Sequence, residues 1–256
     1  MTNQEEAYVK SFTEDNITTV TFFHPQSNSL PGKILNALAD EITKEGKNAN
    51  STVIVLQSAG NKSFCAGASF DELLQINDEK TGLDFFGGFA KVINAMRLCP
   101  KFIIARIQGK CVGGGVGLAA SADYSIALNT SDVKLSELAV GIGPFVVGPA
   151  VERKIGVSAF SALAIDATNW RTAQWAYEKG LFAEIHDTIE KVDEAVLKIA
   201  KTLSTSNPQA MQDLKKVSWE GTENWDRLLP ERAAISGRLI LSDFSRKSIE
   251  KFKAKK

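Results

Sequence analysis

The stretch GKCVGGGVGLAASAD, residues 109–123, contains three consecutive glycines and a fourth two residues later. A glycine inside a helix or strand costs about 0.5–1 kcal/mol relative to alanine, so such a cluster indicates a sharp turn or a close approach of the backbone. An apolar run precedes the cluster and a helix-forming segment follows it. A second loop, FCAGASFDEL, has the same surroundings. Strands that pass through tight turns into helices are typical of α/β proteins.

The hydrophobic periodicity predicts further elements along the chain. Two alternating runs around Glu14, Asp15 and Asn16 predict a hairpin over residues 7–23, and Pro31 begins a helix pattern that extends to residue 46. The other predicted strands are 51–60, 101–109 and 123–129, and further helices are predicted after CAGASFDELL and over 82–99, 187–204, 207–221 and 224–242. The strand signals stop near Asp187. We therefore expect an α/β core over residues 1–186 and a helical region over residues 187–256.

The composition excludes several classes of partner. Thirty basic residues balance thirty acidic ones, so nothing in the charge favours a nucleic acid or an anionic membrane surface. The first ten residues are polar, unlike a signal peptide, and no apolar segment approaches the roughly 18 residues of a membrane span. Three cysteines without C-x-x-C spacing and two distant histidines argue against a zinc site. We expect a cytoplasmic protein with no metal and no nucleic-acid or membrane partner.

The glycine loops do not fit the familiar nucleotide and hydrolase motifs. A dinucleotide pattern that starts at Gly113 would need a third glycine at Leu118, and neither a P-loop nor a G-x-S-x-G nucleophile elbow is present. At a helix start, however, the first N–H groups lack partners and the helix dipole favours negative charge. Two such loops facing each other would direct two N–H donors at one oxygen, which is the arrangement of an oxyanion hole.

Several segments resemble a known family. NKSFCAGASFDEL and GKCVGGGVGLAASADYSIA look like the two signature loops of the crotonase, or enoyl-CoA hydratase/isomerase, superfamily, and VKLSELAVGIGP resembles the third. FFHPQSNSLPGKILNAL and RTAQWAYEKGLFAEI are similar to its substrate-binding loop and to a later segment. The resemblance implies a crotonase-type spiral of ββα units with a C-terminal helical trimerisation region, in a homotrimer or homohexamer. It also implies an acyl-CoA substrate, with no separate cofactor because coenzyme A enters as part of the substrate.

The resemblance further assigns the catalytic groups. The N–H groups of Ala68 and Gly114 would hold the thioester oxygen, and Glu137 would be the acid/base. Hydratases of the family carry a second glutamate, at the position that Gly117 occupies here, and other members carry an aspartate at the position of Phe145. The chain therefore keeps one carboxylate. Its apolar neighbours predict a raised pKa for Glu137.

The remaining binding residues follow from the same motifs. The resemblance implies contacts to coenzyme A from Ser27, Asn28, Ser29 and Ala66, and a phosphate contact from Lys251 of a neighbouring subunit. Gly67, Ser69, Gly113, Gly117 and Phe145 belong to the loops around the acyl group. Ser69 replaces an aspartate that is frequent in the family, and we expect it to cap the following helix.

The sequence leaves several reactions open. The first hypothesis is an enoyl-CoA hydratase-type lyase, and the segment ELAVGIGPFVVGPAVERKIG is similar to those of bacterial methylglutaconyl-CoA hydratases of leucine breakdown. The alternative is an isomerase that moves a double bond between the 3- and 2-positions, for which one glutamate suffices. An acyl-CoA decarboxylase or hydrolase and a non-catalytic scaffold are further alternatives.

Overall fold

The fold repeats a strand–strand–helix unit four times. The computed structural model describes residues 6–254. The first unit is β1 (Tyr8–Glu14), β2 (Ile17–Phe23) and α1 (Gly32–Gly46), and the second is β3 (Val53–Ser58), β4 (Ser63–Cys65), α2 (Phe70–Leu73) and α3 (Glu79–Leu98). The third is β5 (Phe102–Ile107), β6 (Lys110–Val112) and α4 (Gly114–Ser121), and the fourth is β7 (Tyr124–Leu128), β8 (Val133–Lys134), the 3₁₀ turn η1 (Leu138–Val140) and α5 (Gly148–Ile165). The chain continues through α6 (Ala173–Glu178), β9 (Glu184–His186), α7 (Ile189–Ser204), α8 (Pro208–Ser218), α9 (Trp225–Leu239) and α10 (Asp243–Ala254).

The strands form two sheets. The larger has the order β1-β2-β3-β5-β7-β9, in which only β1 and β2 are antiparallel, and the smaller is the parallel set β4-β6-β8. In each of the last three units the first strand joins the large sheet and the second joins the small one. The expected α/β spiral of ββα units is confirmed. The hairpin turn is made by Asp15 and Asn16, both at positive φ, which these two residue types tolerate best after glycine.

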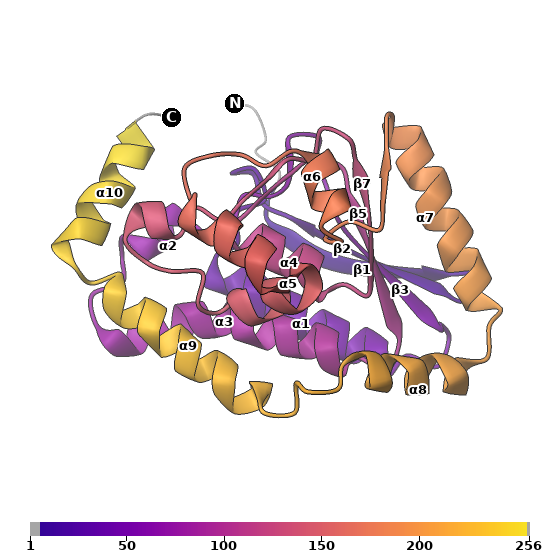
Figure 1. The fold of residues 1–256 in the computed structure, drawn as a ribbon. Coiled ribbons are helices and arrows are strands. Elements are labelled where there is room, and N and C mark those ends of the chain that lie inside the picture. Colours follow the sequence, from indigo (N-terminus) through magenta and orange to yellow (C-terminus); the bar gives the residue numbers. More distant parts are fainter. Residues whose placement is uncertain (1–5, 255–256) are drawn as a thin grey trace.

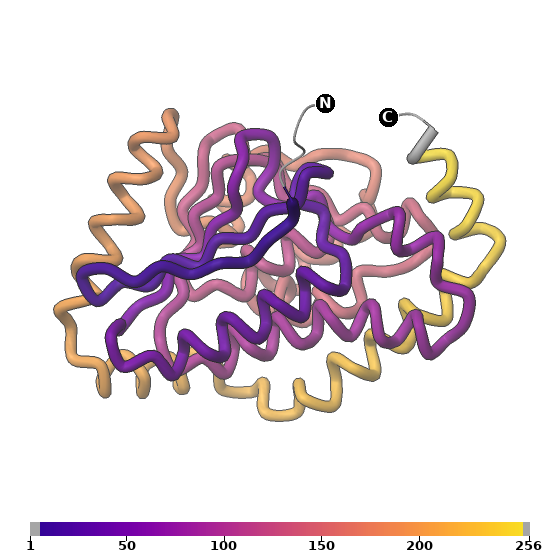
Figure 2. Tube along the Cα trace, turned by 180° about the vertical axis from the view of Figure 1, so that it is seen from behind, coloured from indigo at the N-terminus to yellow at the C-terminus, as the bar shows by residue number. Residues whose placement is uncertain are grey.

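The large sheet is covered on both faces. Ile54 and Leu56 of β3 point into the main core, whereas Val53 and Val55 face the other way and pack against α7. Because both faces are buried, β3 shows a continuous apolar run in the sequence. Figure 1 shows α7 alongside the strands, away from the layer of α1, α3 and α9. From behind, Figure 2 shows the β1–β2 hairpin in front of the sheet with α1 below it.

Helix α3 lies between α1 and α9, and its crossing with α9 is unusually close. A Cβ atom built on Gly82 of α3 would lie 2.7 Å from the Cα atom of Gly237 on α9. The two backbones therefore touch at a point where neither residue has a side chain. This contact fixes α9 beside the inner wall of the site described below.

The last helix, α10, lies at the edge of the molecule and contacts η1. Arg246 of this helix donates a hydrogen bond to the carbonyl of Ile76, and the ring of Phe252 lies edge-on to that of Phe70. Of the helices in residues 6–254, none combines the length and the apolar character that crossing a membrane requires.

Candidate active site

The small sheet brings the two glycine loops together. Strands β4 and β6 are adjacent, with Cys65 opposite Cys111 in the register. Ala68 and Gly114 each follow three residues after these cysteines, so both loops leave the same edge of the sheet. Gly67, at φ +83°, is where the loops meet, because a Cβ atom there would lie 2.8 Å from the carbonyl oxygen of Val112. The two loops therefore face each other, as the oxyanion-hole hypothesis requires.

Both predicted N–H donors are available. Among the described residues, neither the N–H of Ala68 nor that of Gly114 donates to a protein acceptor. Gly114 is the first residue of α4, so its N–H also lies at the positive end of the helix dipole. Both residues line one pocket, together with these described residues: Ala66, Gly67, Phe70, Leu73, Phe86, Phe89, Val112, Gly113, Ser136, Glu137, Val140, Ile142, Gly143, Pro144, Phe145, Val146, Val147 and Ser236.

The glycine cluster is explained by what lies against it. Gly113 has φ +52°, and a Cβ atom there would lie 2.8 Å from Oε1 of Glu137. A Cβ atom on Gly114 would lie 2.1 Å from the ring of Phe89, and one on Gly115 would lie 2.5 Å from the carbonyl oxygen of Cys65. The cluster therefore lets the loop, the carboxyl group and the aromatic wall approach one another directly.

Glu137 supplies the ionisable group of the pocket. It directly precedes η1, and its carbonyl accepts hydrogen bonds from Val140 and Ile142, which fixes the backbone at the pocket wall. The residue is half-buried, but its Oε2 atom is fully enclosed and has no hydrogen-bond partner. Loss of solvation raises the pKa of Glu137 to about 7. This is the direction that the apolar sequence around it predicts, and it suits a group that takes and returns protons near neutral pH.

Gly117 does not line the pocket, although the family motif places a substrate-side residue there. It is buried within α4, and a Cβ atom on it would lie 2.6 Å from Cγ1 of Val147. Val147 does line the pocket. A valine methyl group therefore fills the space that a side chain at position 117 would need. No local pattern predicts this contact, because Val147 lies 30 residues away in the loop before α5.

Two other nearby carboxylates are held elsewhere. Glu72 of α2 accepts a hydrogen bond of 2.7 Å from the N–H of Gly32, at the start of α1. Asp71 accepts one of 2.7 Å from the amide of Gln26. Neither residue lines the pocket, so Glu137 is its only carboxylate among the described residues.

A shallow groove adjoins the pocket and shares Ala66, Ala68 and Phe70 with it. The groove is also lined by Ser27 and Ser29, so the structure brings these two predicted coenzyme A contacts next to the thioester end. The Ser29 hydroxyl is 3.1 Å from Nδ1 of His24. Burial lowers the pKa of His24, while the charge of Asp71 partly opposes that shift.

Asn28 lies under this groove instead of lining it. Its side chain donates to the carbonyls of Ala59 and Ser63 and accepts from the N–H of His24. The carbonyl of Ser27 accepts from the N–H of Ala66. These bonds hold the loop of Ser27 and Asn28 against the segment that leads through Ser63 to Ala66.

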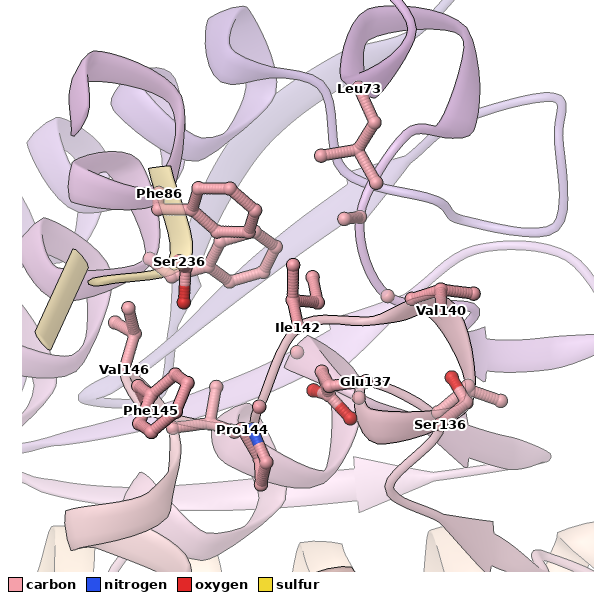
Figure 3. Close-up of a pocket in the computed structure, with 18 of the residues that line it drawn as sticks. Leu73, Phe86, Ser136, Glu137, Val140, Ile142, Pro144, Phe145, Val146 and Ser236 are labelled. Atoms are coloured by element: carbon pink, nitrogen blue, oxygen red, sulfur yellow. The ribbon is translucent and has the colours of Figure 1, made fainter. Parts of the chain in front are cut away.

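The other predicted site residues divide between the pocket and its surroundings. Ser69 is buried outside the pocket, where its hydroxyl caps α2 by accepting from the N–H of Glu72, as we expected. Phe145 lines the pocket beside Pro144 (Figure 3). Lys251 is exposed on α10, next to Phe252. Its predicted contact with a neighbouring subunit stays a prediction.

Sequence reasoning missed Ser136 and Ser236, whose hydroxyl groups line the pocket. Ser136 is adjacent to Glu137, so the third family motif contains it. Ser236 comes from α9, and no local signal in the sequence distinguishes it from a small residue in a helix interface.

Comparisons with known proteins identify the family of the chain. The family model described as "Enoyl-CoA hydratase/isomerase" matches residues 13–256. A "Short-chain-enoyl-CoA hydratase" of Clostridium acetobutylicum is 29% identical over 220 residues, which are 82% of this chain and 80% of that protein. A "(7aS)-7a-methyl-1,5-dioxo-2,3,5,6,7,7a-hexahydro-1H-indene-carboxyl-CoA hydrolase" of Mycobacterium tuberculosis is 25% identical over 208 residues, 79% of this chain and 80% of that protein.

The fold has close structural counterparts as well. The crystal structure of enoyl-CoA hydratase from Bacillus halodurans superposes with a TM-score of 0.87 at 21% identity, covering 95% of this chain and 99% of that one.

Proposed function

This chain belongs to the enoyl-CoA hydratase/isomerase family, and on that premise we propose that it moves the double bond of an enoyl-CoA between the 3- and 2-positions. Membership of this family already assigns the chain to the enzymes that process acyl-CoA thioesters. The choice of reaction rests on one observation. Glu137 is the only carboxylate that lines the described pocket, and Val147 fills the place of a second one.

The proposed reaction needs only the groups present. The thioester oxygen accepts hydrogen bonds from the N–H groups of Ala68 and Gly114. The carboxylate of Glu137 removes a proton from C2 of a 3-enoyl thioester, and the electron pair moves into the conjugated enolate, whose oxyanion the two donors stabilise. Glu137 then returns the same proton to C4 while the thioester carbonyl re-forms. The product is the 2-enoyl thioester, and no water is consumed.

Hydration of a 2-enoyl-CoA is the second candidate, because the relative from Clostridium acetobutylicum carries that activity in its name. Adding water in this pocket would require Glu137 both to activate the water and to deliver the proton. The two candidates differ in product mass, since only hydration adds a water.

The deciding experiment gives the purified protein a 3-enoyl-CoA and a 2-enoyl-CoA separately and follows both by chromatography and mass spectrometry. We expect conversion of the 3-enoyl substrate at unchanged mass. A product heavier by one water, without isomerisation, would establish hydration instead. No change in either substrate would contradict both candidates.

The same assay tests Glu137. Glu137→Gln should lower kcat/KM by about 100-fold or more, because a neutral amide cannot accept the proton, while a saturated acyl-CoA should bind almost as before. For the wild type, kcat/KM should rise as the pH is raised through about 7, because the ionised carboxylate is the base. The matched control is Glu152→Gln, which changes an exposed carboxylate on α5 and should leave both quantities unchanged.

A further inference from the structure

Among the described residues, two polar side chains line the pocket that the proposed reaction does not use, Ser136 and Ser236, and Ser236 is the more deeply buried. Ser236 on α9 is 2% exposed, and its hydroxyl has no hydrogen-bond partner among the described residues. A serine inside a helix commonly bonds back to the carbonyl four residues earlier. Ser121 of α4 does so, donating to the carbonyl of Gly117 at 2.8 Å. Ser236 has no such bond, so its hydroxyl is left for whatever occupies the pocket.

The surroundings of this hydroxyl are apolar. Figure 3 shows its oxygen directed into the space bounded by Phe86, Phe145 and Val146. Ser136 lies on the opposite side of that view, with Glu137 between the two serines. If coenzyme A lies in the adjoining groove at Ala66, Ala68 and Phe70 and the thioester at Ala68 and Gly114, an acyl chain that continues past Glu137 reaches Ser236. The hydroxyl is open to the pocket, so a ligand oxygen that enters can bond to it in place of water.

The charge of the pocket limits which ligand atom fits. Among the described residues that line the pocket, none is lysine, arginine or histidine, and Glu137 is the only ionisable one. A carboxylate on the acyl chain would lose its hydration here without gaining a cationic partner. A hydroxyl or carbonyl oxygen bears no net charge and can bond to Ser236.

The backbone holds Ser236 in place. The next residue, Gly237, lies against Gly82 of α3 backbone to backbone, which places Ser236 in a closely packed part of α9. A hydroxyl on such a rigid element discriminates between ligands better than one on a mobile loop.

We propose that Ser236 selects acyl-CoA substrates whose acyl chain carries a neutral hydrogen-bonding oxygen, a hydroxyl or a carbonyl, beyond the reacting carbons. The inference deepens the proposed function and rests on it for the acyl-CoA orientation. It differs from the dicarboxylic acyl group that the resemblance of residues 137–156 suggests.

The test measures binding, which is independent of the reaction. Saturated acyl-CoA ligands of equal length that carry a hydroxyl, a carbonyl, a methyl or a carboxylate group at successive positions along the chain are titrated by calorimetry. We expect one hydroxyl or carbonyl position to bind about five- to tenfold more tightly than its methyl counterpart, the range that one neutral hydrogen bond supplies. The carboxylate ligands should bind most weakly.

Two variants isolate the hydroxyl. Ser236→Ala should abolish the preference while leaving the affinity for the methyl ligand unchanged. Ser236→Cys, which keeps the shape of the side chain with a slightly larger atom and a weak donor, should reduce the preference in the same way. Ser218→Ala, the same change at an exposed position of α8, should have no effect.

Three results would overturn the inference: no preferred oxygen position in the wild type, an unchanged preference in Ser236→Ala, or tightest binding of a carboxylate ligand. If the wild type does not isomerise the 3-enoyl-CoA but still prefers one oxygen position, only the proposed reaction is rejected. Isomerisation with an unaltered preference in Ser236→Ala would reject this inference alone.

Discussion

Gly117 and Val147 are far apart in the chain, yet Val147, which lines the pocket, occupies the space that a side chain at position 117 would need. The family motifs predicted Glu137 and the raised pKa followed from its apolar neighbours. The same motifs identified Gly117 as a departure but gave no physical reason for it. The reason is a tertiary contact with Val147, which no local pattern encodes.

This contact predicts that a single variant at position 117 is destabilised and that a second change at Val147 restores its stability. Gly117→Glu alone should lower the free energy of unfolding by about 1–3 kcal/mol or prevent folding, because its Cβ would overlap Val147. Adding Val147→Gly should recover stability, because it removes both clashing carbon atoms. With the second carboxylate directed into the pocket, the double variant should gain hydration of a 2-enoyl-CoA.

Urea unfolding and the mass assay check the two halves of this prediction. Val147→Gly alone is the control, since it opens the space without adding a carboxylate. Wild-type stability in Gly117→Glu would show that Val147 does not block position 117.

At the scale of elements, the sequence predicts most of the fold and misses the elements that build the site. The hairpin, α1, α3, β5 and β7 follow from runs long enough to show a period. Strands β4 and β6 have only three residues each, too few for an alternating pattern, so the sequence predicts only a glycine loop after each preceding strand. Their side-by-side pairing is nevertheless what brings the two N–H donors together.

The close crossing of α3 and α9 can be tested by substituting two glycines of α3, one at the crossing and one away from it. Gly82→Ala should lower the free energy of unfolding by about 1–3 kcal/mol, because its Cβ would meet the backbone of Gly237 at 2.7 Å. Gly87→Ala has nothing within 4 Å and should stabilise the protein by up to about 1 kcal/mol through helix propensity. Chemical unfolding of both variants gives the comparison, and equal effects would contradict the close crossing.

At the scale of the whole molecule, the buried carboxyl of Glu137 couples folding to pH. Its pKa is about 7 in the folded protein and 4.5 in a solvated chain, so the folded state binds the proton more tightly. The resulting stability is fully present below pH 4.5 and is lost as the pH rises to 7. The shift corresponds to about 3 kcal/mol at most.

Glu137→Gln should therefore unfold at higher urea concentration than the wild type at pH 8, and at nearly the same concentration at pH 4.5. Comparing the two proteins at each pH cancels the contributions of all other titrating groups. A difference that does not change with pH would mean that the carboxyl is solvated in the folded state. Protein concentration must be held constant, because any assembly would add its own stabilisation.

The placement of both oxyanion donors on the main chain has a consequence for mutational surveys. An alanine scan leaves Ala68 untouched, and at Gly114 it reports mainly the collision of the new methyl group with Phe89. Such a survey would find Glu137 and overlook the groups that are proposed to stabilise the charge. Detecting them requires changing the backbone itself, by replacing the amide N–H with an ester oxygen at residue 68 or 114.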